Sequence, residues 1–455
     1  MHSRPICRLA LATLCVVLVA CGADTVAPTT PPPASVRATA GSSDAPGTGT
    51  VAPAPESDSE IYPPNPGAIV VAIDAGHGGC LDWGVPDPSQ RGVQLAEKTL
   101  TLGIAQSLRD LLEADGVRVV MIRDADEALA GDDYPPLGCE GAPFRDVNGD
   151  GMSGFGNDEL PEATRTRDEL QARLDLANLA QADALISIHI NSPFDAGQPV
   201  EIAFSETYYT DETPWGVDET ARLADAIEAG VVAQLEPLAD YERGDRGTTA
   251  HNFYIVAPPL LVTTEDRPNR WAQPTRGGLM PVVLSEVGSI TLRAEHDLLA
   301  SEPGRDAVAA GLFDGLAAFF ADRPVAARIG LDAGAASPPT AVPGDGPPFW
   351  PATAPDEPVR LVLTNSGTEA WSADLELVAG WQATDEPYLA FAPDAIEALD
   401  VSVPALAPGE SATVEVTLPS PAGQMRSVAW ISLRDGSELF SDHGSPALQL
   451  SSEAP

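Results

Sequence analysis

The sequence contains little positive charge. It has 25 Lys and Arg residues against 67 Asp and Glu residues, a formal net charge of -42 at pH 7, and Lys98 is the only lysine. Because nucleic acid phosphates would be repelled by such a surface, the charge argues against a nucleic acid partner. It also provides no electrostatic attraction to anionic membranes or acidic polymers. We therefore expect no nucleic acid partner.

The N-terminal apolar run is too short to span a bilayer. The apolar run at residues 9–20 follows Arg4 and Arg8, which is typical of an export signal. It ends in Leu18-Val19-Ala20-Cys21, which resembles a bacterial lipobox. The resemblance implies that residues 1–21 are a lipoprotein signal peptide, that Cys21 is lipidated, and that the exported protein is anchored to a membrane in the cell envelope, facing the periplasm or cell wall. An ordinary signal peptide with a chance cysteine is the alternative.

Cysteine is scarce beyond the signal segment. Of the five cysteines, Cys7 and Cys15 lie in the signal and Cys21 is the expected lipidation site, which leaves Cys80 and Cys139. An exported protein folds in an oxidising compartment, where a remaining pair favours a disulfide. We therefore predict a Cys80–Cys139 disulfide.

Two stretches have few of the large apolar residues needed for a packed core. Residues 22–66 are rich in Pro, Ala, Thr, Ser and Gly, and residues 324–358 in Pro, Gly and Ala. Such segments cannot bury enough surface to fold, so we expect a disordered tether and a linker, respectively. The remaining chain then forms one domain over residues 68–323 and another over residues 359–455.

Strand and helix patterns alternate through residues 68–323. The run at residues 69–73 is apolar without alternation, which indicates a strand buried on both faces. A long loop at about 124–164 interrupts the alternation as an insertion. Further strand patterns occupy residues 117–122, 184–190, 252–256 and 282–287. The pattern predicts an α/β fold with a mostly parallel sheet flanked by helices.

Short alternating strands replace this pattern in residues 359–455 and predict a C-terminal β-sandwich. Asn365-Ser366-Gly367-Thr368 followed by Trp371 resembles a bacterial immunoglobulin-like domain. No catalytic constellation occurs there, so we interpret the domain as a spacer or as a binding module for an envelope protein partner. We expect its tryptophans, Trp371, Trp381 and Trp430, to serve in packing.

Residues capable of metal chemistry follow the strands of the first domain. His77 follows the first strand, in Asp74-Ala75-Gly76-His77-Gly78-Gly79, while His189 and Glu286 lie near the ends of two later strands. Glu97 begins a helix on the same side of the sheet. Because ligands bind at the carboxyl ends of parallel strands, we expect all four side chains at one rim. Two imidazoles and one carboxylate leave a fourth zinc position open for water, as in catalytic sites, and leave Glu286 free to act as a base.

In this order, the segments resemble the zinc-dependent N-acetylmuramoyl-L-alanine amidases, which cleave bacterial peptidoglycan. The matching segments are the motif around His77, Glu97-Lys98, Ser187-Ile188-His189-Ile190-Asn191, Arg246-Gly247 and Ser285-Glu286-Val287-Gly288. The resemblance implies that His77, Glu97 and His189 bind zinc and that Glu286 is the catalytic glutamate. Ala75 stands where proline is common in the family, and the insertion is longer than usual.

The resemblance implies hydrolysis of the amide between N-acetylmuramic acid and L-alanine, for cell-wall remodelling or daughter-cell separation. One alternative is a zinc peptidase that cuts within the stem peptide. Another is a non-catalytic lipoprotein that only binds the cell wall. The intact set of ligands together with Glu286 argues against this second alternative.

The insertion carries a second candidate metal site. Asp146-Val147-Asn148-Gly149-Asp150-Gly151 has the D-x-N-x-D-G spacing of a calcium loop. Asn157 occupies the twelfth position, where such loops carry glutamate. A polar loop rich in turns explains the motif as well, and both interpretations stay open: Asp146, Asn148 and Asp150 are candidate Ca²⁺ ligands beside the expected Zn²⁺ site.

Overall fold

The computed structural model describes ten segments of the chain. They are residues 68–79, 82–86, 91–130, 147–148, 167–259, 275–332, 358–372, 374–383, 392–418 and 427–452. The signal peptide with Cys21, the tether, the predicted Cys80–Cys139 disulfide, and Asp146 and Asp150 of the calcium motif lie outside them. Within the described segments, no helix has both the length and the apolar character needed to cross a membrane.

A six-stranded sheet forms the centre of the first domain, in the order β2-β1-β3-β8-β6-β7. Strands β2, β1, β3 and β8 are parallel to one another, β6 is antiparallel to β8, and β7 is parallel to β6. The mostly parallel sheet is thus confirmed. The strands are β1 (Val70–Ala75), β2 (Arg118–Met121), β3 (Ala184–Asn191), β6 (Ala203–Tyr209), β7 (Arg243–Ala250) and β8 (Val282–Ser289).

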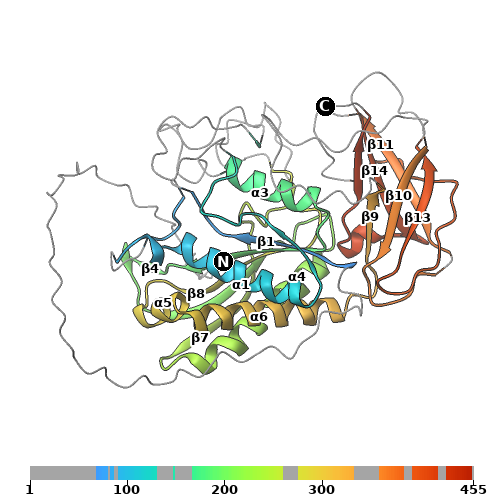
Figure 1. Cartoon of the computed structure of the whole chain (residues 1–455). Helices are drawn as coiled ribbons and strands as arrows, with labels where there is room; N and C mark the ends of the chain where they lie inside the picture. The colour runs from blue at the N-terminus through green and yellow to red at the C-terminus, as the bar shows by residue number, and fades with distance from the viewer. Residues whose placement is uncertain are drawn as a thin grey trace, which may run out of the picture.

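Helices cover both faces of this sheet, which is why β1 is buried along its whole length (Figure 1). The apolar sides of α1, α4 and α6 pack on one face, and α3 packs on the other. The helices are α1 (Glu97–Ala114), α3 (Arg167–Leu179), α4 (Val217–Leu235), α5 (Arg293–Ala300) and α6 (Glu302–Ala321). The short elements are η2 (Val93–Leu95), η3 (Glu236–Leu238), β4 (Phe194–Asp195) and β5 (Gln198–Pro199).

The strand expected at residues 252–256 is absent, and this prediction was wrong. The edge strand is instead β7, whose sequence is mostly polar and only partly buried. Tyr254, Ile255 and Val256 form a turn whose side chains pack in the core beneath α3. The apolar run therefore reflects burial of a turn rather than a strand.

The C-terminal domain consists of two facing sheets around an apolar core. One contains β9 (Ala327–Leu331), β10 (Pro358–Asn365) and β13 (Ser411–Thr417). The other contains β11 (Glu376–Ala383), β12 (Glu397–Ala398), β14 (Ser427–Asp435), β15 (Glu438–Leu439) and β16 (Leu448–Ser451), with η4 (Phe440–His443) beside it. Strand β9 lies in the stretch expected to be a linker, and it pairs with β10.

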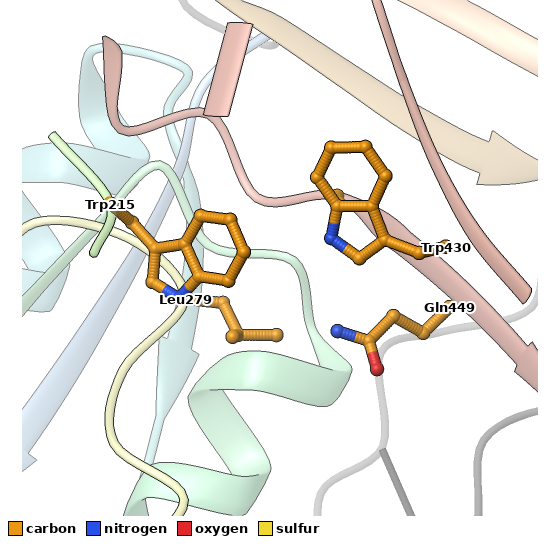
Figure 2. Close-up of a pocket in the computed structure, with 5 residues that line it drawn as sticks. Trp215, Leu279, Trp430 and Gln449 are labelled. Atoms are coloured by element: carbon orange, nitrogen blue, oxygen red, sulfur yellow. The ribbon is translucent and has the colours of Figure 1, made fainter. Parts of the chain in front are cut away.

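The two domains share a buried contact. Trp215 of the first domain stacks on Trp430 of β14, with ring centroids 6.2 Å apart and an interplanar angle of 21°. Leu279, Ala447 and Gln449 complete the lining of a narrow pocket between the two rings (Figure 2). Trp371 instead lies in the core of the sandwich, and the partly buried Trp381 packs against that core. The tryptophans thus serve in packing, and Trp430 packs between the domains.

Candidate metal centre and active site

His77 follows the carboxyl end of β1 in an unusual backbone conformation. Its φ angle is +62°, in the left-handed region that side chains other than glycine rarely adopt. The preceding Gly76 allows β1 to approach β3, because a Cβ atom there would lie 2.6 Å from the His189 ring and the Ile188 carbonyl oxygen. Such strained turns are frequent at functional sites, where the surrounding structure holds them.

Glu97 is the first residue of α1 and is buried, with 3% of its surface exposed. Its Oε1 accepts a hydrogen bond from the backbone N–H of Ile190 (3.0 Å), and its Oε2 accepts one from Val85 (2.8 Å). A carboxylate at a helix N-terminus is also favoured by the helix dipole. Burial opposes its charge, but the nearby His77 and His189 imidazoles hold the pKa of Glu97 well below its usual value.

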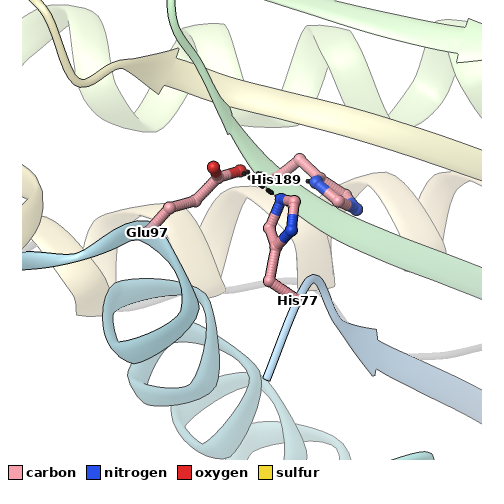
Figure 3. A group of neighbouring side chains, drawn as sticks. All are labelled: His77, Glu97 and His189. Atoms are coloured by element: carbon pink, nitrogen blue, oxygen red, sulfur yellow. Dashed lines mark ion pairs between the residues drawn. The ribbon is translucent and has the colours of Figure 1, made fainter. Parts of the chain in front are cut away.

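The Glu97 carboxylate contacts both histidines (Figure 3). Its Oε1 lies 3.1 Å from His77 Nε2 and 3.3 Å from His189 Nδ1. One ligand atom from each of the three residues lies within 4.8 Å of the others. Tetrahedral zinc with bonds of about 2.0–2.1 Å separates its ligand atoms by about 3.3 Å. The three side chains therefore fit a single metal ion, and the structure brings them together as the sequence predicted.

Asp82 contacts the far side of the His77 ring and was missed in the sequence. Its Oδ1 lies 2.7 Å from His77 Nδ1, which leaves Nε2 directed toward Glu97. Burial disfavours a charged imidazole, but the Asp82 and Glu97 carboxylates outweigh it and raise the pKa of His77 well above its ordinary value. A carboxylate on the second ring nitrogen fixes the tautomer and orientation of a metal-binding histidine. No sequence signal separates Asp82 from Asp87, the other acidic residue of its loop.

Arg173 of α3 holds the turn that carries His77. Its guanidinium donates to the Asp74 carboxylate (2.6 Å), to the carbonyl of His77 (2.7 Å) and to Glu169 (2.9 Å). Asp74 also accepts a hydrogen bond from Ser187 (2.7 Å). Burial raises the pKa of Asp74, but Arg173 outweighs this and lowers it below the usual value. Arg173 thus ties the helix to the sheet, and Asp74 supports the site from behind.

Glu286 of β8 pairs with His189 of β3 and lies across from Glu206 of β6. Its Oε2 is buried and has no hydrogen-bond partner among the described residues. Burial, reinforced by the Glu97 and Glu206 carboxylates, raises the pKa of Glu286 well above its usual value. An orphaned carboxylate oxygen beside three grouped ligands is suited to accept a proton from a reactant. Glu206 was not identified from the sequence.

Asn148 is the one candidate calcium ligand within the described segments. Its backbone N–H donates to Asp168 (3.1 Å), and its side chain hydrogen-bonds with Tyr254. The preceding Val147 is buried, and its carbonyl accepts a hydrogen bond from Arg276 (2.7 Å). These contacts fix this point of the insertion against the α/β domain.

Comparisons with known proteins agree on the first domain. The family model described as N-acetylmuramoyl-L-alanine amidase matches residues 71–318. The germination-specific N-acetylmuramoyl-L-alanine amidase of Bacillus subtilis is 24% identical over 264 residues, which cover 56% of this chain and 81% of that protein. The uncharacterised protein YqiI of the same organism is 24% identical over 250 residues, covering 55% of this chain and 84% of that protein.

Among solved structures, the N-acetylmuramoyl-L-alanine amidase AmiC2 of Nostoc punctiforme aligns with a TM-score of 0.35 and 24% identity. The alignment covers 55% of this chain and 95% of that one. The family match spans the segment that contains His77, Glu97, His189 and Glu286 and accounts for more than half of the sequence. The chain therefore belongs to the N-acetylmuramoyl-L-alanine amidase family, and it is an amidase of that type.

Proposed function

We propose that this protein uses zinc to hydrolyse the amide bond between N-acetylmuramic acid and L-alanine in peptidoglycan. The observation that carries the proposal is the position of Glu97 Oε1, within 3.3 Å of nitrogens from both His77 and His189. Two imidazoles and one carboxylate form the donor set of catalytic zinc sites, which keep a coordination position open. Family membership identifies the bond that is cut.

Each residue of the site has a role in this proposal. His77, Glu97 and His189 hold the zinc, which when bound polarises the amide carbonyl and lowers the pKa of water to about 7. Glu286 takes the proton of the attacking water and passes it to the leaving amine, as a general base and then a general acid. Its raised pKa favours the uptake of that proton. Asp82 holds His77 in the orientation that presents Nε2.

Digestion of purified peptidoglycan tests the proposal directly. We expect glycan strands without peptide and new L-alanine amino termini, detected by mass spectrometry of the products. Treatment with a chelator should abolish the release, and added Zn²⁺ should restore it. Cleavage within the stem peptide would indicate a peptidase instead, and the absence of any release would leave only wall binding. Either result would contradict the proposal.

Replacing Asp82 with asparagine should weaken zinc binding by about 10- to 100-fold, the usual cost of losing the partner of a ligating histidine. The amide removes the charge that fixes the His77 tautomer but keeps the shape of the loop. Competition with a chelator of known affinity measures the effect. Asp124, which pairs with Arg109 at the surface, supplies the matched control in Asp124→Asn. Equal affinities in the two variants would show that Asp82 does not orient His77.

We further propose that the protein acts at the cell envelope, in wall remodelling or daughter-cell separation, anchored by lipid on Cys21. Cys80 and Cys139 are proposed to form a disulfide, which the oxidising compartment supports. Mass spectrometry of the exported protein decides both points. An unmodified Cys21 or free thiols at the other two cysteines would overturn the corresponding assignment.

We also propose Ca²⁺ binding by the 146–151 motif, with Asp146, Asn148 and Asp150 as ligands. The spacing supports the proposal. Calorimetric titration of Ca²⁺ into the wild type and Asp146→Ala tests it, and the absence of binding heat in the wild type would reject it.

A further inference from the structure

Beyond Glu286, a row of polar side chains continues across the sheet. Glu206 of β6 lies opposite Glu286 of β8, and Phe204, Glu206 and Tyr208 share one face because side chains alternate along a strand. The opposite face of β6 carries Ser205 and Thr207, which donate to Glu228 of α4. The row therefore extends from the metal-binding residues toward the edge strand β7.

A bulge in β7 places Arg246 at the end of this row. Ser205 pairs with Asp245 and Thr207 with Thr248, so two residues of β7, Arg246 and Gly247, stand opposite Glu206. Gly247 has a φ of +68°, and its N–H donates to the Asp245 carboxylate (2.7 Å), which fixes the bulge. Bulges beside active sites redirect side chains that would otherwise continue the strand pattern.

The guanidinium of Arg246 is held by its neighbours but keeps its capacity to donate hydrogen bonds. It lies 3.4 Å from the centroid of the Phe204 ring, and its Nη1 lies 3.8 Å from Glu206 Oε2. Within the described segments it makes no hydrogen bond, and 48% of its side chain is exposed. Thr249 and Tyr208 donate hydrogen bonds to the Glu206 carboxylate, so its negative charge is stabilised by groups other than Arg246.

Two other arginines close to the metal-binding residues within the described segments cannot serve a ligand. Arg123 and Arg173 are each 1% exposed, and their guanidinium groups donate to backbone carbonyls or buried carboxylates. Arg246 instead presents free N–H groups to solvent on the same face as Glu286. A planar guanidinium recognises a carboxylate through two parallel hydrogen bonds, and stacking on an aromatic ring holds that plane in place.

We propose that Arg246 binds a carboxylate of the peptide that leaves with L-alanine. The enzyme then prefers a stem peptide with a free carboxylic acid at the bound group to one with a carboxamide there. The inference rests on the proposed function, because the amidase reaction places the peptide on the leaving-amine side of the site. Glu206 and Phe204 position the guanidinium without touching the substrate. In so acidic a protein, a carboxylate ligand requires such a fixed cation.

Two muramyl dipeptides test the inference, one ending in D-glutamate, whose α-carboxyl is free, and the other in D-isoglutamine, whose α-carboxyl is a carboxamide. They differ only by a free carboxylate against a carboxamide. Zinc-loaded Glu286→Gln protein should bind the acid about 10- to 100-fold more tightly than the amide, as expected for a charged pair of hydrogen bonds. Adding Arg246→Gln should reduce this ratio to near one. The matched control Arg434→Gln, in the sandwich, should keep it.

Turnover by the zinc-loaded enzyme gives a second readout. The Arg246→Gln change should raise KM for the acid far more than it lowers kcat. Equal binding of both dipeptides, no detectable binding, or an unchanged ratio in the Arg246→Gln protein would each overturn the inference. If the wild type binds the acid selectively but releases no peptide from peptidoglycan, the proposed function fails while the role of Arg246 stands.

Discussion

Replacing Glu286 with glutamine should lower kcat for peptide release from peptidoglycan by about 10²- to 10⁴-fold, the usual contribution of general acid–base catalysis. The amide keeps the volume of the side chain but cannot accept the proton of the attacking water. Glu286 lies beside His189 in the register of the sheet but is not one of the three grouped metal ligands. Zinc content, measured by atomic emission, should therefore stay at the wild-type value.

A control in the sandwich separates this effect from general damage. Glu376, which pairs with Arg434 at the surface, supplies the same chemical change in Glu376→Gln and should leave kcat unchanged. The buried Oε2 of Glu286 lacks a hydrogen-bond partner within the described segments, so the substitution breaks no internal bond there and folding should survive. Unchanged turnover in Glu286→Gln would contradict the assigned role. Loss of zinc together with activity would instead indicate a fourth ligand.

The site residues were predictable because they follow uninterrupted apolar strands. His77 and His189 stand where buried parallel strands end, and Glu97 begins the next helix, so topology alone brings them to one rim. The face of the sheet on which each side chain projects follows from the alternation of successive side chains along a strand. These inferences require only a pattern within each segment.

Residues whose role depends on contacts between segments could not be identified from the sequence. The pairing of Glu206 with Arg246 requires the register of β6 on β7 and a bulge in a polar strand. His296 of α5 is buried, and it hydrogen-bonds to the carbonyl of Leu95 and to Arg91, which lie in another segment. Strand β9 lies in a Pro/Gly/Ala-rich stretch and becomes a strand through its partner β10.

Asp183 contributes to the docking of the sandwich on the first domain. We expect Asp183→Ala to lower the free energy of unfolding by about 3–5 kcal/mol, as when one partner of a buried ion pair is removed. Asp183 immediately precedes β3 and is fully buried. It accepts hydrogen bonds from Arg323 (3.1 Å), Ser366 (3.0 Å) and the N–H of Val70 (2.9 Å). The substitution leaves the buried Arg323 guanidinium without its counterion.

Chemical unfolding measures this loss against Asp332→Ala, which removes one partner of a more exposed ion pair with Arg360 and should cost at most about 1 kcal/mol. Asp183 lies six residues before His189, about 20 Å along an extended strand. Its contact with the sandwich is therefore at the end of the strands opposite to the metal-binding residues. Asp183→Ala protein that remains folded should therefore keep the wild-type KM. If Asp183→Ala and Asp332→Ala lose equal stability, Asp183 does not contribute to the docking of the sandwich. A change in KM without a loss of stability would instead mean that the sandwich influences the site across the sheet.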